Sequence, residues 1–125
     1  MGSLDTRDMS GQFDSDDIRK NSPLAAIGYI PVLFLIPAFA TQSPFAKFHA
    51  NQGLILTIYS IITFLAAKII GWVIGWIPVI GWIVSGLISI VLGLSVLALI
   101  IIGIVNAVGG KAKELPVIGG ILKVF

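Results

Sequence analysis

The alternation of polar and apolar residues divides the chain into a polar start, a long apolar middle and a mixed tail. Residues 1–22 are rich in Asp, Ser and Gly and poor in aromatic residues, which predicts a polar, disordered N-terminal tail. Apolar residues dominate 23–108, and lysines alternate with apolar residues over 109–125. We therefore expect a transmembrane helical domain over 23–108 and an interfacial C-terminal tail over 109–125.

The first apolar segment, Leu24 to Phe39, is short for a membrane span. As a helix it would be roughly 24 Å long, against a hydrocarbon core of about 30 Å. Pro31 and Pro37 each remove a backbone donor, so this helix should be kinked or end early. It spans if Ser22 to Thr41 are counted, and a re-entrant hairpin is the less favoured alternative.

The second segment has a clear helix start. Ser43 suits the N-cap position, and Pro44 suits the first helical position, where a missing N–H costs nothing. The first two turns, up to Gln52, are amphipathic and fit the membrane interface. The span then runs from Gly53 to about Trp76, roughly 36 Å of helix, which fits the bilayer with some tilt.

The third segment, Ile83 to Val108, would be about 39 Å long as a helix. The connector Trp76–Trp82 contains Pro78 and Gly81 as helix breakers and tryptophans suited to the membrane interface. A fourth helix would require two spans to meet at Lys68 with no turn residues between them. The pattern predicts an all-α integral membrane protein with about three transmembrane helices, four being the alternative, plus interfacial amphipathic segments.

A short repeat accompanies the helix breaks. The sequence Pro-Val-Ile-Gly occurs at 78–81 and again at 116–119. Two four-residue matches in so Ile-rich a chain are near chance expectation. We interpret them as two turns of similar chemistry and not as a duplicated unit.

Composition strengthens the membrane assignment. Hydrophobic residues make up 57% of the chain and charged residues 11%, with a mean hydropathy of +1.03, whereas soluble domains are about 25% charged. Between Leu24 and Gly110 the charged residues are Lys47 and Lys68. The lipid bilayer is therefore an expected partner, and the cell (inner or cytoplasmic) membrane is the expected location. The absence of an Arg-rich stripe argues against nucleic acid as a partner.

Lysine counts near the ends of the spans predict an orientation. With three spans, the C-terminal lysines share a face with Lys47, while Arg19 and Lys20 lie opposite. This arrangement predicts the N-terminus outside and the C-terminus inside the cell. An even number of spans would place both termini inside.

The chain offers little catalytic chemistry. It has a single histidine, His49, no cysteine and no intramembrane Asp or Glu, so neither a Ser-His-Asp arrangement nor a zinc site can be assembled in the span. The aspartates at 14, 16 and 17 lack the glycine and distal Glu of a calcium loop and are interpreted as solvated charge. We predict that the protein is not an enzyme and needs no cofactor or metal.

Lys68 is the single charge inside a predicted span and has two interpretations. An intramembrane charge marks a pathway by default. However, Lys68 lies only about 12 Å from a helix end at Trp76, so the ammonium can snorkel to the interface, and this interpretation is favoured. Small residues four apart on both long segments allow close helix packing and self-association. These pairs are Gly71/Gly75, Ser85/Ser89 and Ser89/Gly93.

Polar residues at the start of the second segment form the candidate site. His49 and Gln52 share a helix face, and with three spans they meet the tail, where Asn106 and the carbonyls at Gly109-Gly110 are the nearest expected partners. The simpler interpretation is a structural staple between segment and tail, and the sharper one is a cytoplasmic docking surface. The candidate residues are His49, Asn51, Gln52, Asn106, Lys111, Lys113, Pro116 and Gly119.

Two motifs carry a family resemblance. SPFAKFHANQGLIL (Ser43 to Leu56) and IIGIVNAVGGKAKELPVIG (Ile101 to Gly119) resemble the small bacterial membrane proteins related to Tic-twenty, the import component of the chloroplast inner envelope. The likeness covers about Leu24 to Ile121. It implies a multi-pass helical fold, and the plastid proteins, which have four spans, are associated with protein translocation.

Two classes of function follow. The first is a non-enzymatic multi-pass membrane subunit that docks another protein or assists its assembly or translocation. The alternative is a self-assembling small channel or holin-like permeability factor, which would make a homo-oligomer the partner. The polar groups are sparse for a water-filled path, and this favours the first class, with a second membrane protein as the partner.

Overall fold

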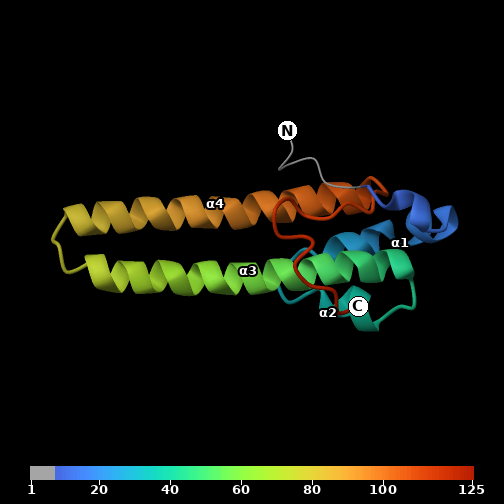
Figure 1. The fold of residues 1–125 in the computed structure, drawn as a ribbon, viewed down its shortest axis with the longest axis horizontal. Helices are drawn as coiled ribbons and strands as arrows, with labels where there is room; N and C mark the ends of the chain where they lie inside the picture. Colours follow the sequence, from blue (N-terminus) through green and yellow to red (C-terminus); the bar gives the residue numbers. More distant parts are fainter. Residues whose placement is uncertain (1–7) are drawn as a thin grey trace.

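The computed structural model describes residues 8–125, and its regular structure is helical. A short 3-10 helix, η1 (Ser10–Gln12), precedes α1 (Ser15–Ile27), α2 (Leu35–Phe39), α3 (Pro44–Ile74) and α4 (Ile80–Val108). The long helices α3 and α4 lie side by side as a hairpin, and α1, α2 and the C-terminal tail gather around one end of it (Figure 1). The prediction of an all-α membrane protein is confirmed.

Within residues 8–125, α3 and α4 are the two helices long and apolar enough to cross a membrane. Their 31 and 29 residues correspond to about 46 and 43 Å, more than the hydrocarbon core needs. We call residues 58–100 the shaft and residues 8–57 with 101–125 the head. Along the shaft, bulky apolar side chains such as Phe64 and Trp72 point outward, where lipid can cover them.

The segment Leu24 to Phe39 does not form the single helix that we expected. Helix α1 ends at Ile27, and the chain turns before α2 begins at Leu35. At the turn, Val32 adopts a φ of 75°, and its N–H donates to the Thr57 hydroxyl at 3.1 Å. The chain then returns, so that Ser43 donates to Asp17, near the start of α1. The segment is thus a reversal of the chain rather than one continuous helix, and Pro31, which lacks an N–H, lies at this reversal.

The polar N-terminal region is more ordered than the sequence predicted, because α1 already begins at Ser15. Before α1, the N–H of Met9 donates to the carbonyl of Ala112 at 2.9 Å, and the N–H of Ala112 donates to the Ser10 hydroxyl at 2.9 Å. The residues from 8 onward therefore lie beside the C-terminal tail, at the same end of the hairpin. The expectation of an N-terminus and a C-terminus on opposite faces is not confirmed.

Residues from α1, α3, α4 and the C-terminal tail form one apolar core in the head. Tyr29 and Phe45 are fully buried in it, together with Leu56 and Leu115. Gly103 of α4 faces the ring of Tyr29 so closely that a Cβ there would overlap the ring. Helix α4 thus packs directly against the Tyr29 ring in the head, although both long helices continue into the shaft.

The two Pro-Val-Ile-Gly segments adopt the same turn. Val79, between α3 and α4, has a φ of 63°, and Val117, in the tail, has a φ of 69°. In each turn the Ile N–H donates to the Pro carbonyl at 2.7 Å, and the Gly N–H donates to the residue before Pro at 3.0 or 3.1 Å. The prediction of two turns of similar chemistry is confirmed. One turn closes the far end of the shaft, and the other lies in the head.

Candidate functional site

The start of α3 is held by two side chains. As predicted, Ser43 is the N-cap: its hydroxyl accepts from the N–H of Ala46 at 3.1 Å. Asp17 of α1 adds a second acceptor, because its carboxylate receives the N–H of Phe45 at 3.1 Å and the hydroxyl of Ser43. With Pro44 at the first position, the free donors of the first turn are satisfied and an anion faces the positive end of the helix dipole.

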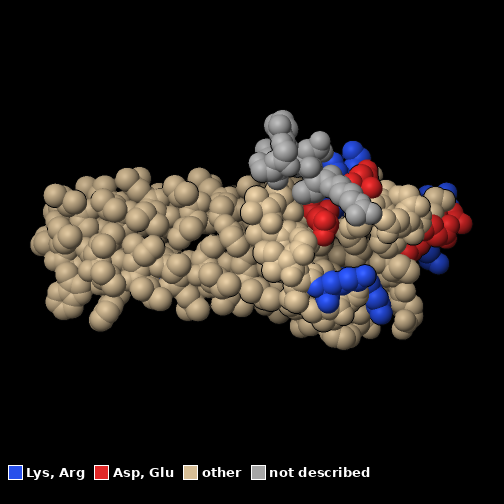
Figure 2. All heavy atoms as spheres, viewed as in Figure 1, with Lys and Arg blue, Asp and Glu red and all other residues tan. Residues whose placement is uncertain are grey.

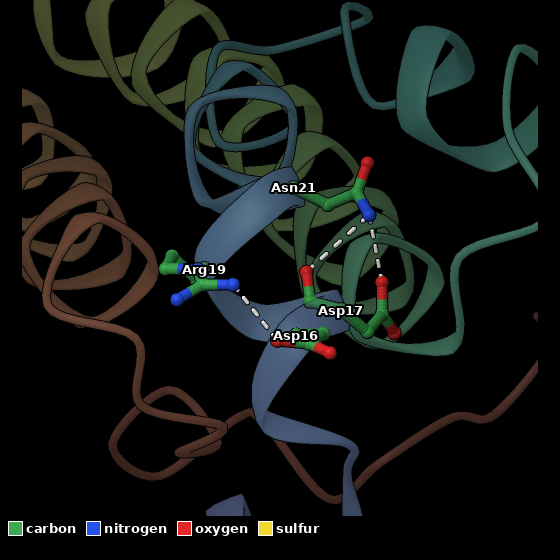
Figure 3. A network of polar contacts seen from close by, with 4 residues as sticks. All are labelled: Asp16, Asp17, Arg19 and Asn21. Carbon is green, nitrogen blue, oxygen red and sulfur yellow. Dashed lines mark hydrogen bonds and ion pairs between the residues drawn. The ribbon is translucent and has the colours of Figure 1, made fainter.

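Asp17 therefore has a structural role that the sequence did not reveal, since we expected solvated charge. Figure 3 shows it receiving two contacts from the neighbouring Asn21, one of them a 2.7 Å hydrogen bond to the carboxylate. Partial burial alone would raise the pKa of Asp17, but the hydrogen bonds from Ser43, Phe45 and Asn21 outweigh it and hold this pKa below its ordinary value. The adjacent pair of Asp16 and Arg19 is exposed, at 2.8 Å, and contributes little.

His49 is fully buried and joins three parts of the head. Its Nε2 lies 3.0 Å from the carbonyl oxygen of Lys111, just after α4, and its Nδ1 contacts the hydroxyl of Tyr29. A carbonyl can only accept, so Nε2 carries the proton and Nδ1 accepts from Tyr29. The rings of Phe45 and Phe48 pack edge-on against the imidazole, with centroids 4.8 and 5.1 Å away.

Gln52 and Asn51 hold the C-terminal tail by its backbone. The amide of Gln52 donates to the carbonyl of Gly119 at 2.9 Å and accepts from the N–H of Leu115 at 2.9 Å, so it bridges the tail turn. Asn51 donates to the carbonyl of Leu122 at 2.8 Å and accepts from the N–H of Val124 at 2.6 Å. We call His49, Asn51 and Gln52 the staple, because all three fix the tail onto α3.

The other candidate residues occupy different positions around the staple. The carbonyl of Asn106 accepts the N–H of Lys111 at 2.8 Å and so ends α4, instead of partnering His49 or Gln52. Lys113 lies in a backbone bridge with Asp8. Pro116 and Gly119 are buried in the tail turn, where Gly119 leaves room for the Gln52 amide. The sequence thus identified the right segments but not their contacts, because the partners are backbone groups.

A cavity of about 580 Å³ lies beside the staple, and we call it the head pocket. Phe13 and Phe48 contribute apolar surface, with ring centroids 5.7 Å apart. Lys47 and Lys123 supply positive charge at its wall. The remaining lining comes from three stretches of the chain: Met9 and Gln12; Gln42, Pro44, Asn51 and Gln52; and Glu114, Gly120, Leu122 and Phe125.

The sequence missed the N-terminal side of this pocket, because residues 1–22 were interpreted as a disordered tail. The available signal was Phe13, an isolated aromatic residue in a polar run. Within residues 8–125, no group of three or more His, Cys, Asp or Glu side chains is placed to hold a metal ion. The pocket offers ammonium, amide, carboxylate and aromatic groups.

Charge is distributed very unevenly between head and shaft. In Figure 2 the Lys, Arg, Asp and Glu side chains gather over the head, and the visible face of the shaft carries none. The far turn instead carries three tryptophans, Trp72, Trp76 and Trp82, all largely exposed. This distribution is typical of a hairpin inserted in a bilayer with its charged end at the surface.

No family model and no solved structure matches the chain. The UPF0132 membrane protein MJ1527 of Methanocaldococcus jannaschii is 36% identical over 80 residues, which are 64% of this chain and 49% of that protein. The magnetosome protein MmsF of Paramagnetospirillum magneticum is 28% identical over 100 residues, 79% of this chain and 82% of that protein. The chain thus spans about half the length of the archaeal relative. With the two apolar helices, these relatives support a membrane-associated protein.

Proposed function

We propose that the protein is a non-enzymatic, multi-pass membrane subunit that docks another protein in the head pocket and assists its assembly or translocation. The observation that carries this proposal is the construction of the pocket. Three distant stretches of the chain form it, and the staple holds the tail in place beside it. A site fixed in this way loses little conformational entropy on binding. The translocation part of the proposal rests on the sequence resemblance to Tic-twenty-like proteins alone.

The distribution of charge supports a cytoplasmic head. Within residues 8–125, every Lys and Arg except Lys68 lies in the head. Short loops rich in Lys and Arg stay on the cytoplasmic side of the cell membrane. With two spans, both described ends of the chain would face the cytoplasm, and the head pocket would be open to cytoplasmic proteins.

The lining of the pocket indicates the chemistry of the partner. Lys47 and Lys123, set against the one carboxylate of Glu114, leave the lining with an excess of positive charge. This excess favours a negatively charged segment, and electrostatic complementarity would orient it. Phe13, Phe48 and Phe125 offer aromatic surface for apolar anchor side chains, which carry most of the energy in protein interfaces. An acidic segment with apolar residues is therefore the expected partner.

The test is photo-crosslinking in native membranes from a photoreactive residue at position 48. We expect a protein adduct that disappears when Lys47 and Lys123 are both changed to Glu. The control is Lys20→Glu, an exposed head charge outside the pocket, which should leave the adduct intact. Crosslinks to lipid alone, or an adduct insensitive to the double reversal, would contradict docking.

The same purified protein distinguishes docking from the channel alternative. A self-assembling channel or holin-like factor would release a dye trapped in liposomes. We expect no release, because the outward surface of the shaft is mainly large apolar side chains. Dye release that rises with protein concentration would favour the channel.

A further inference from the structure

A second cavity, of about 630 Å³, lies within the shaft between α3 and α4, and we call it the shaft cleft. Toward the head it is bounded by a hydrogen bond of 2.7 Å between the hydroxyls of Tyr59 and Ser95. Toward the far turn the helices close again, where a Cβ on Gly71 would lie 3.0 Å from the Ser85 hydroxyl. The cleft is therefore an opening between the two helices of the shaft.

Several hydrogen-bond donors in the cleft have no acceptor in the described part of the chain. Lys68, Ser85 and Ser89 all line it, and within residues 8–125 the structure gives none of these three side chains a hydrogen-bond acceptor. The hydroxyls of Ser60 and Thr63, on the same cleft, donate to carbonyls of their own helix, at 2.8 and 3.0 Å. An ammonium and two hydroxyls without acceptors are costly in a hydrocarbon environment.

The ammonium of Lys68 points away from the nearer membrane surface. It lies 5.4 Å from the ring centroid of Phe64, which is one helical turn closer to the head. Lys68 itself is about 12 Å of helix from Trp76. In this conformation the side chain runs back toward the middle of the shaft.

We propose that the shaft cleft binds a transmembrane helix of another protein that carries an Asp or Glu side chain near the middle of its span. A carboxylate has only acceptors, so it can receive hydrogen bonds from Lys68, Ser85 and Ser89 and neutralise the ammonium. Small residues along the cleft, including Gly71 and Gly93, allow a third helix to approach closely.

A second copy of this chain does not supply the missing charge. The shaft contains no Asp or Glu, and its one charged residue is Lys68. Two copies packed through this cleft would place two ammonium groups together in the bilayer, which is unfavourable. Charge complementarity therefore points to a different protein, independently of what the head pocket binds.

The experiment uses the full chain reconstituted in phosphatidylcholine liposomes and a synthetic transmembrane peptide. The peptide is a Leu-rich span with one Glu at its centre, and its matched control carries Gln there. Association is measured by energy transfer between fluorophores on protein and peptide. We expect the Glu peptide to bind about tenfold or more tightly than the Gln peptide, as a charge-assisted hydrogen bond would provide.

Three substitutions test whether the preference arises in the cleft. Lys68→Met removes the charge and keeps an unbranched side chain of similar length, so it should reduce binding of the Glu peptide to the level of the Gln peptide. Lys47→Met, in the head, should leave the preference unchanged, which separates this site from the head pocket. Lys68→Glu should reverse the preference toward a peptide with a central Lys.

Three results would overturn the proposal. The first is equal binding of the Glu and Gln peptides to the unaltered protein, a comparison that needs no variant to fold. The second is a Glu preference that survives Lys68→Met. The third is loss of the preference when phosphatidylglycerol replaces part of the phosphatidylcholine, because Lys68 would then be paired with lipid phosphate.

Discussion

The head and the shaft share two helices but are held together differently. In the head, Gln52 and His49 are buried and find backbone partners tens of residues away. In the shaft, Phe64, Trp72 and other large apolar side chains face outward, and Lys68 has no acceptor among the described residues. The head has a buried apolar core and satisfies the polar groups within it, whereas most large apolar side chains of the shaft face outward. Four sets of substitutions probe this contrast, from the largest expected effect to the smallest.

Removing a large side chain should give the largest difference in stability loss between the head and the shaft. Tyr29→Ala empties a fully buried site in the head, and we expect it to lower the free energy of unfolding by about 3–5 kcal/mol. Phe64→Ala, in the shaft, removes a ring that is 61% exposed. Lipid or detergent refills that space, so we expect a loss of no more than about 1 kcal/mol.

The measurement is reversible unfolding in detergent micelles, followed by circular dichroism for both variants. Similar losses from the two substitutions would show that the head does not have a core of its own. A larger loss from Phe64→Ala would place the main packing in the shaft.

Breaking the staple should lower the free energy of unfolding by less than Tyr29→Ala does, and its effect should be confined to the tail. Gln52→Leu leaves the N–H of Leu115 and the carbonyl of Gly119 without partners in a buried site. Two unsatisfied groups should cost about 2–4 kcal/mol. Hydrogen exchange should show the amide of Leu115 losing its protection, while amides in the middle of α4 keep theirs.

Gln42→Leu is the matched control, because Gln42 is exposed at the pocket wall. It should change neither stability nor exchange in the tail. If Gln52→Leu also loosens the middle of α4, then head and shaft unfold as one unit and the contrast between them is weaker than the contacts suggest.

The sequence predicted those features of the fold that depend on neighbouring residues. Ser43-Pro44 identified the first turn of α3, and the Pro-Val-Ile-Gly repeat identified two turns. Such signals depend on the dihedral preferences of single residues. They also depend on backbone N–H groups that a proline lacks or that a cap satisfies within one helical turn. The all-α membrane fold followed equally well from hydropathy.

The features of the fold that the sequence did not predict depend on contacts between distant residues. An apolar segment such as Leu24 to Phe39 looks alike whether it crosses a bilayer or folds back onto a helix. What decides its path is the meeting of Asp17 with Ser43 and Phe45, 26 and 28 residues further along the chain. The head pocket was missed for the same reason, because its walls come from both ends of the chain.

Asp17 gives the head a dependence on pH that the shaft lacks. Its pKa is lower in the folded protein than the ordinary value of 3.8, so the unfolded chain binds its proton more readily. The stabilisation that the Asp17 carboxylate provides is therefore complete above about pH 3.8. It is lost as the pH falls toward and through the pKa of Asp17 in the folded protein. Asp17→Asn should remove this pH-dependent part and cost about 1 kcal/mol at neutral pH through the weakened cap.

Melting temperatures measured from neutral pH down to about pH 3 test this linkage. The comparison variant is Asp16→Asn, which removes an exposed carboxylate paired with Arg19. The difference between the unaltered protein and Asp17→Asn should narrow as the pH falls, while Asp16→Asn should follow the unaltered protein. A difference that stays constant would mean that the Asp17 carboxylate does not stabilise the start of α3.

The smallest effects are expected at the two matching turns, which let head and shaft be compared with the same chemistry. A β-branched residue at positive φ is strained by about 1–2 kcal/mol, and Val79 and Val117 both adopt this conformation. Changing either to Gly removes the strain but raises the entropy of the unfolded chain by a similar amount. The net change should stay within about 0.5 kcal/mol at both turns. Both side chains are exposed, at 58% and 82%, so little packing is lost with them. A clear destabilisation by Val79→Gly alone would mean that its side chain has a role at the far membrane interface that Val117 lacks in the head.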